Sequence, residues 1–227
     1  FKCLVGSQTA LVDGEKTPHE YQRGQIIFYE GNPAFAVYCI CSGAVKLYKS
    51  LRNGEQRVIR LLGPQQIMGY RAVFADEYYG ATAQAVERSF VCTIPKSTLL
   101  KLLHQSHELT LQFLSKVSVE LRISEEQMLS LTEHSVKQRL AQLLLSLSGH
   151  EFTPTKEPLQ IKSFLSRSEI AQMIGTTPET LSRTLHELAA KGVVHLHDIN
   201  IYVNDFSKLQ RIANGLNNGI DVNQVKS

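Results

Sequence analysis

The segment from Ser166 to Leu188 constrains the fold of this 227-residue chain more than any other. Ser166-Arg-Ser-Glu169 is a capping box, a pattern in which serine and glutamate side chains satisfy backbone amides at a helix start. The apolar run that follows ends at Gly175, and glycine tolerates the left-handed backbone at a helix end. Thr177-Pro178 then combines an N-cap with proline at the first helical position. Two short helices joined by such a turn predict a helix-turn-helix.

The second of these helices has an apolar side and a polar side, since successive residues turn by about 100°. The apolar side consists of leucines: Leu181, Leu185 and Leu188. The polar side carries Glu179, Ser182 and Arg183 near the helix start, where a recognition helix meets base edges. Arginine can donate two hydrogen bonds to guanine, and glutamate can accept one from cytosine. The predicted DNA contacts are Ser168, Thr177, Pro178, Glu179, Thr180, Ser182 and Arg183. The alternative is a surface Glu179–Arg183 pair, which stabilises a helix by only about 0.2–0.5 kcal/mol.

Residues 21–94 have the pattern of a compact all-β domain, with short β-prone runs separated by turn residues. The predicted strands are Gln25–Tyr29, Ala36–Ile40, Ala44–Ser50, Gln56–Leu62 and Phe90–Ile94. Asn53-Gly54 between two of these runs is the strongest hairpin signal in the chain. Strands this short and this closely spaced favour a barrel or roll over a parallel sheet.

At about Ser97 the pattern changes to helix, and a heptad seam follows. The seam residues recur at steps of three and four: Leu114, Val117, Leu121, Ser124, Met128 and Leu131. Glu120 and most of the neighbouring charged residues lie off this seam. An apolar seam needs a partner, and a second copy of the same helix would supply it. The alternative is that the seam packs against the chain's own β-roll.

Ser135-Val-Lys-Gln138 is a further capping box and predicts that the long helix breaks near His134. We therefore divide the chain into a β-roll sensor domain (1–110), a dimerisation helix (111–134) and a DNA-binding domain (135–227). Residues 149–158 have the composition of a loop. Val193–Leu196 and Ile201–Val203 predict a β-hairpin wing beside the helix-turn-helix.

The composition is that of a globular protein: 43% of the residues are hydrophobic and 20% are charged, with a net charge of +3. No apolar run approaches the roughly 18 residues that a membrane-spanning helix needs. Cys3, Cys39, Cys41 and Cys92 lack paired CxxC spacing, which favours buried or half-buried thiols of a cytoplasmic protein. Cys39 and Cys41, two apart in a strand, should point to one face. We predict no metal site, since His195 and His197 share a strand face without further ligands nearby.

No catalytic motif is recognisable: the chain has no P-loop, GxSxG, HExxH, or GxGxxG after a strand. We therefore predict that the protein is not an enzyme. A dimerising or ligand-sequestering module without DNA binding is a second hypothesis. Protection of a palindromic DNA site would distinguish a regulator from such a module.

These residues, in this order, resemble the Crp/Fnr family of the cyclic-AMP receptor protein and the fumarate–nitrate reduction regulator. The likeness runs from about Tyr21 to Leu209 and includes Arg23–Phe28, Glu30-Gly31 and Cys41–Leu47. It implies an α+β fold: an N-terminal double-stranded β-helix of the cyclic-nucleotide-binding type, a long dimerisation helix and a C-terminal winged helix-turn-helix. It also implies a homodimer on a palindromic promoter site, in contact with RNA polymerase.

Within this family, Pro178-Glu-Thr-Leu-Ser-Arg183 is similar to the E-x-x-S-R pattern of the fumarate–nitrate type. The cyclic-AMP type has R-E-T-x-G-R, and here proline replaces the first arginine and serine replaces the glycine. The resemblance therefore implies TTGA-like half-sites rather than TGTGA. Whether the protein activates or represses depends on promoter geometry, and neither this nor the target genes can be deduced from the chain.

The nucleotide-binding cassette departs from the family pattern, in which a glutamate binds the ribose and an arginine and a serine hold the cyclic phosphate. Tyr70 replaces the glutamate, Tyr79 falls at the arginine and Gly80 at the serine. Tyrosine cannot supply the cation that a phosphate needs, so cyclic AMP is not expected to bind in the usual mode. The candidate effector pocket is Gly69, Tyr70, Arg71, Tyr79, Gly80, Ala81, Thr82 and Ser124.

The effector itself stays open. A haem-bound gas sensor could use His19, His104, His107 or Met68 as ligands, and a redox input could act through Cys39 and Cys41. An iron–sulfur cluster has little support because only Cys3 lies near the start, although residues upstream of Phe1 could carry further cysteines. The sequence is also compatible with an unidentified small ligand, with a non-standard cyclic-AMP pocket and with a regulator that has no effector. A signal received in the β-roll would act through packing along residues 114–131 and through the break near His134.

Overall fold

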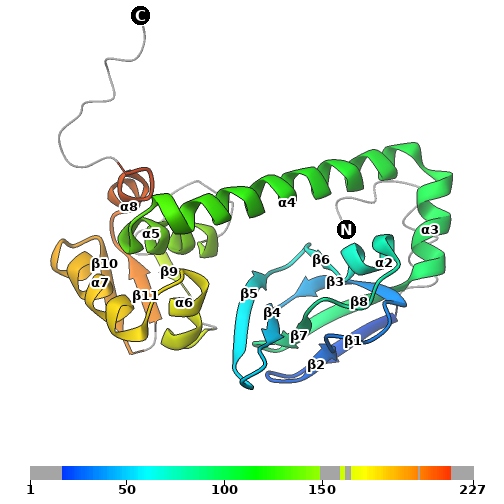
Figure 1. The fold of residues 1–227 in the computed structure, drawn as a ribbon, viewed down its shortest axis with the longest axis horizontal. Coiled ribbons are helices and arrows are strands. Elements are labelled where there is room, and N and C mark those ends of the chain that lie inside the picture. Colours follow the sequence, from blue (N-terminus) through cyan, green and yellow to red (C-terminus); the bar gives the residue numbers. More distant parts are fainter. Residues whose placement is uncertain (1–16, 149–158, 162–164, 199, 216–227) are drawn as a thin grey trace, which may run out of the picture. The chain divides into compact units, whose positions relative to one another are not determined.

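The computed structural model describes residues 17–148, 159–161, 165–198 and 200–215, and Figure 1 shows how its helices and strands are arranged. The chain forms two compact units, residues 1–123 and 124–227. The division falls inside the long helix α4 (His107–Glu133), so this helix contributes to both units.

The first unit contains two four-stranded antiparallel sheets (Figure 1). One sheet has the strand order β1-β8-β3-β6 and the other has the order β2-β7-β4-β5. The strands are β1 (Thr17–Tyr21), β2 (Ile26–Phe28), β3 (Ala36–Ser42), β4 (Val45–Ser50), β5 (Gln56–Leu62), β6 (Ile67–Met68), β7 (Thr82–Ala85) and β8 (Ser89–Pro95). The predicted β-roll is confirmed.

Strand β3 organises two hydrophobic clusters because it is buried on both faces. Ala36, Tyr38 and Ile40 join a cluster drawn from both sheets. Val37 and Cys39 belong to the opposite cluster, which the helices α2 (Tyr70–Ala75) and α3 (Lys96–Gln105) and the start of α4 complete. Alternation of side chains along a strand explains why odd and even residues enter different clusters.

All five predicted strands are present, and no end is shifted by more than two residues. The hairpin at Asn53-Gly54 is confirmed: β4 pairs antiparallel with β5, and Gly54 has a φ of 83°. The sequence did not indicate β1, β6, β7 or α2. β1 contains Pro18 and is exposed, and β7 is half alanine, so both depart from typical strand composition. Only the positions of their neighbours in the sheets make them strands.

The cysteines differ from one another in exposure. Cys39 is 1% exposed and Cys92 is 5% exposed, but Cys41 is exposed. The prediction of buried or half-buried thiols is therefore wrong for Cys41. The pairing of β3 with β8 shifts register between Ile40 and Ser42, and a bulge of this kind turns side chains out of the regular alternation. Cys3 lies outside the described residues.

The helical part begins where the sequence indicates, with α3 and then α4. α4 ends at Glu133, and α5 (Val136–Leu147) starts behind a complete capping box between Ser135 and Gln138. The predicted helix break near His134 is confirmed. No helix in the described part of the chain is long and apolar enough to cross a membrane.

The second unit combines helices with a small sheet. Its elements after α5 are β9 (Leu159–Ile161), α6 (Arg167–Met173), α7 (Pro178–Ala190), β10 (Val194–His197), β11 (Asn200–Val203) and α8 (Phe206–Ala213). β10, β11 and β9 form an antiparallel sheet in that order, which confirms the predicted hairpin wing and adds a third strand to it. α5 packs against α8 and α7 and buries Leu140, Ala141 and Leu144. The predicted loop 149–158 lies outside the described residues.

Candidate nucleic-acid interface

The helix-turn-helix forms at the residues that the sequence indicates. Ser166 and Glu169 make both hydrogen bonds of a capping box at the start of α6. Gly175 has a φ of 63° in the turn, as the left-handed helix end requires. The Thr177 hydroxyl accepts a hydrogen bond from the Thr180 backbone amide at 3.3 Å, and Pro178 follows as the first residue of α7. Local capping thus fixes where each helix starts and stops.

Helix α7 is held by its apolar side. Leu181, Leu185 and Leu188 are at most 1% exposed, and Ile170 and Ala171 of α6 are also buried. Packing of α7 against α6 and β10 sets the orientation of its polar side. That polar side therefore belongs to a rigid element and not to a loop.

Most of the predicted DNA contacts are exposed at the start of α7: Thr177, Pro178, Glu179, Ser182 and Arg183. Thr180 is half-buried, and Ser168 is exposed on α6. The pKa of the Glu179 carboxyl is held below its usual range, because its own backbone amide and the Thr177 hydroxyl hydrogen-bond to it. Within the described residues, Arg183 makes no ion pair or hydrogen bond, with Glu179 or with any other group. The surface-pair alternative is absent in this part of the chain, and the Arg183 guanidinium is available to an external acceptor.

Arg139 on α5 is a positioning residue that the sequence did not indicate. Its Nε donates to the Ile174 carbonyl at 2.7 Å, and its Nη1 donates to the His134 carbonyl at 2.6 Å. These carbonyls belong to the turn of the helix-turn-helix and to the end of α4. A Cβ on Gly175 would lie 3.0 Å from the Leu131 Cδ2, so the last seam residue packs against the same turn. One guanidinium therefore connects the end of α4 to the turn before α7.

The wing carries two exposed histidines on one face of β10, as predicted. His195 stacks on Tyr202 with ring centroids 4.5 Å apart, and its Nδ1 lies 3.0 Å from the Asn204 Oδ1. The His197 Nδ1 lies 3.3 Å from a carboxylate oxygen of Asp198. In the described residues, no three His, Cys, Asp or Glu side chains are grouped so that they could hold a metal ion.

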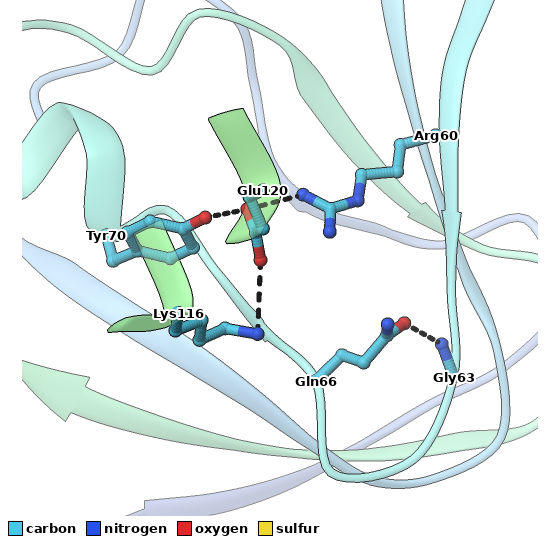
Figure 2. Close-up of polar contacts among 6 residues, drawn as sticks. All are labelled: Arg60, Gly63, Gln66, Tyr70, Lys116 and Glu120. Atoms are coloured by element: carbon cyan, nitrogen blue, oxygen red, sulfur yellow. Dashed lines mark hydrogen bonds and ion pairs between the residues drawn. The ribbon is translucent and has the colours of Figure 1, made fainter. Parts of the chain in front are cut away.

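Among the residues proposed for the effector pocket, Tyr70 contacts Glu120, a residue of α4 that lies off the heptad seam and that no sequence pattern marked. Tyr70 donates a hydrogen bond from its hydroxyl to Glu120 Oε2, and Arg60 on β5 donates to the same oxygen at 2.7 Å (Figure 2). Lys116 Nζ lies 3.1 Å from the other carboxylate oxygen. The Glu120 side chain is only 14% exposed. In the first unit, Tyr70 thus joins α2 to α4 through a shared carboxylate.

The remaining cassette residues have different environments. Tyr79 is 2% exposed, stacks on Phe28 and donates its hydroxyl hydrogen to the Ala36 carbonyl at 2.7 Å. Arg71 is exposed, and its Nη2 occupies the place where the Cβ of a side chain at Gly80 would lie. The hydroxyl of buried Thr82 accepts a hydrogen bond from the Glu30 amide. Gly69 caps α2 with a φ of 83°, Ala81 is buried, and Ser124 belongs to the second unit.

The suggested haem ligands do not share an environment. Met68 is 1% exposed within the apolar cluster of both sheets, whereas His19, His104 and His107 are exposed. An axial ligand pair would require such groups to face one another across a pocket. Nothing in the placement of these four residues favours haem.

The heptad seam of α4 is open to solvent in the single chain. The exposed fractions are 61% for Leu114, 39% for Val117, 60% for Leu121, 72% for Met128 and 53% for Leu131. Phe113, off the seam, makes an edge-to-face contact with Phe74 within the first unit, with the ring centroids 5.6 Å apart. The alternative that the seam packs on the β-roll finds no support in these exposures.

Comparison with known proteins identifies the class to which the two units belong. Residues 18–106 match the cyclic nucleotide-binding domain family, and residues 138–212 match the Crp-like helix-turn-helix domain family. A β-roll of this type followed by this helix-turn-helix defines a DNA-binding transcription regulator and not an enzyme. The chain belongs to the Crp/Fnr family.

The relatives include a cyclic AMP receptor protein and a transcriptional activator protein. The chain is 30% identical to the cyclic AMP receptor protein of Thermus thermophilus over 86% of this chain and 88% of that protein. It is 28% identical to the transcriptional activator protein anr of Pseudomonas aeruginosa, over 95% of this chain and 88% of the relative. The structure of FixK2 from Bradyrhizobium japonicum has the same fold, with a TM-score of 0.76 at 24% identity, covering 87% of this chain and 96% of that one.

Proposed function

We propose that this chain acts as a homodimer that binds palindromic DNA with TTGA-like half-sites through α7. The observation that carries the proposal is the polar start of α7, where Glu179, Ser182 and Arg183 are exposed on a helix fixed by buried leucines. A regulator of transcription works at the chromosome, so we place it in the cytoplasm. Contact with RNA polymerase stays an expectation from the family.

The two charged residues on α7 would recognise different bases. Arg183 has no competing partner in the described residues and can donate two hydrogen bonds to one guanine. Glu179 has a lowered pKa and is therefore ionised at neutral pH, as an acceptor of a cytosine amino hydrogen must be. Each contact of this kind contributes about 1–3 kcal/mol of discrimination at one base pair.

The test is fluorescence anisotropy of the full chain on a labelled TTGAT-N4-ATCAA duplex and on a scrambled duplex, at one fixed salt concentration. Arg183→Ala is expected to weaken binding to the palindrome by about 1–3 kcal/mol and to relax preference at one base pair. Arg52→Ala removes the same exposed charge from the β4–β5 turn and should leave both affinities unchanged. Equal weakening of Arg183→Ala on both duplexes would assign Arg183 to the phosphate backbone and contradict the proposal.

The homodimer is supported by the exposed seam of α4. A contiguous apolar surface of this kind on a single chain marks an interaction site, and a heptad repeat pairs best with another helix of the same repeat. Two valines provide a matched test: Val117 lies on the seam and is 39% exposed, whereas Val119 lies off it and is 45% exposed. In sedimentation measurements, Val117→Glu should yield monomers and Val119→Glu should stay dimeric. The same oligomeric state for both variants would contradict the proposal that the seam forms the dimer interface.

We further propose that cyclic AMP is not held in the usual mode. Tyr79 is committed to the core and offers no cation, and Tyr70 is committed to Glu120. The same anisotropy measurement with and without cyclic AMP tests this point. Selective binding that is indifferent to the nucleotide would support it. DNA binding that appears only with cyclic AMP would support the proposed regulator but would mean that the nucleotide binds in a non-standard pocket.

A further inference from the structure

Three cysteines gather on one sheet of the first unit. Cys39 and Cys41 lie on β3, and Cys92 lies on β8 directly opposite Cys39 in the antiparallel ladder. Residues opposite one another in such a ladder point to the same face, so Cys39 and Cys92 share a face. The Sγ atoms of Cys41 and Cys92 are 3.1 Å apart although these residues are 51 positions apart in the chain. All three residues carry thiols in this structure.

The environments of the two close sulfurs are unequal. Cys41 is exposed because it lies in the bulge between Ile40 and Ser42, whereas Cys92 is 5% exposed. The Cys39 sulfur lies 3.9 Å from the Ile40 carbonyl oxygen. Susceptibility of a thiol to oxidation follows its exposure, and redox-active cysteines commonly have a second cysteine beside them that resolves the first product. Cys41 has the exposure expected of the cysteine that is oxidised first, and Cys92 has the position expected of the resolving cysteine.

We propose that Cys41 and Cys92 form a redox modification site, and that hydrogen peroxide converts them to an intrachain disulfide. The Cys41 sulfur attacks one peroxide oxygen; an S–O bond forms, the O–O bond breaks, and the first water leaves. The Cys92 sulfur then attacks the Cys41 sulfur; the S–S bond forms, the S–O bond breaks, and the second water leaves. The two thiols together give up two electrons and two protons, and the peroxide is reduced to water.

The fold requires little movement for this step. A disulfide needs the sulfurs at about 2.05 Å, so the two must approach by roughly 1 Å from their present separation. The strands that carry them are already hydrogen-bonded neighbours, with Cys39 facing Cys92 and Ile40 facing Val91. The site is independent of DNA binding, so its failure would leave the proposed function untouched.

The test uses the full chain, reduced and then freed of reductant, with hydrogen peroxide as the probe. After alkylation with N-ethylmaleimide, proteolysis without reductant and mass spectrometry should yield one linked peptide pair containing Cys41 and Cys92. Dithiothreitol should reverse the link. Cys41→Ser, at an exposed position, should abolish it, whereas Cys39→Ala and Cys3→Ser should both retain it.

Three outcomes would overturn the site. One is a link from Cys92 to Cys39 with Cys41 still alkylated. Another is a link to Cys3 or between chains in place of the internal one. The third is conversion of Cys41 to a sulfinic acid while Cys92 stays reduced, because a resolving thiol in contact with Cys41 should prevent it.

Discussion

The start of α7 and the start of α2 are both short helical sites that the sequence marks as functional, but their side chains behave differently. At α7 the polar residues Glu179 and Arg183 point to solvent, and capping within a few residues explains the local structure. At α2 the equivalent prominent residue, Tyr70, is 8% exposed and its hydroxyl contacts Glu120, 50 positions away. The polar residues at the start of α7 are therefore accessible to a binding partner. The hydroxyl of Tyr70 at the start of α2 is instead hydrogen-bonded to another residue of the same chain.

This difference has a physical basis. A recognition helix needs only a buried side and a defined N-terminus, and both follow from periodicity and caps. A small-molecule pocket is defined by residues from several elements, so its contents depend on tertiary packing. Substitutions that remove local contacts in one site and distant contacts in the other should therefore have different effects on stability.

The largest effect is expected from the apolar side of α7. Leu185 is 1% exposed, so Leu185→Ala should lower the free energy of unfolding by about 2–5 kcal/mol, because it removes buried methyl groups and leaves a cavity. Urea denaturation followed by circular dichroism measures the change. Leu51→Ala, at a 36% exposed leucine in the β4–β5 turn, should cost under about 0.5 kcal/mol. A loss below the control's for Leu185→Ala would mean that α7 is not held by its buried side.

The next effect concerns the contact between Tyr70 and Glu120. Tyr70→Phe removes a hydrogen bond to a carboxylate and should cost about 1.5–3 kcal/mol. A double-mutant cycle with Glu120→Gln should give a coupling energy of about 0.5–3 kcal/mol, because the two side chains are in direct contact. Tyr78→Phe, at a tyrosine that is 65% exposed, is the matched control and should be near neutral. Additive effects of Tyr70→Phe and Glu120→Gln would mean that the two side chains are not coupled. The Tyr70 hydroxyl would then be available to a ligand, as the polar residues of α7 are.

A smaller effect distinguishes two glycines of the second unit. Gly175 and Gly192 both have positive φ, 63° and 68°, so an alanine at either should cost about 1–2 kcal/mol in backbone strain. Only at Gly175 would the added Cβ meet a neighbour, Leu131 Cδ2 at 3.0 Å. Gly175→Ala should therefore lower the thermal midpoint more than Gly192→Ala does. Equal shifts in differential scanning calorimetry would show that the turn and the end of α4 can move apart without cost.

The features that the sequence predicts are those that depend on local contacts, and the features that it misses depend on contacts between distant residues. The caps at Ser135, Ser166 and Thr177 are local, and each lies where the pattern predicts it. The side chains of Glu120 and Arg139 act through groups distant in sequence, so no local pattern marked them. The approach of Cys41 to Cys92 depends on strand pairing and on a bulge, neither of which a single sequence specifies. The place of the candidate DNA contacts at the start of α7 was thus predictable, and the contact of Tyr70 with Glu120 was not.

The smallest expected effect is a pH dependence at the last helix. Asp205 caps α8 by accepting the Lys208 amide at 2.8 Å, and this hydrogen bond holds the pKa of the Asp205 carboxyl below its usual range. A carboxyl whose pKa is lower in the folded state stabilises the fold above its unfolded pKa of about 3.9, and the contribution is lost as the pH falls toward the folded pKa. Asp205→Ser keeps a capping oxygen that does not titrate, so it should match the parent within about 0.5 kcal/mol at pH 7. Between about pH 5 and pH 3 its thermal midpoint should fall less than that of the parent, since only the parent loses a cap by protonation. Parallel midpoints over that range would mean that the amide of Lys208 does not discriminate between the two protonation states of Asp205.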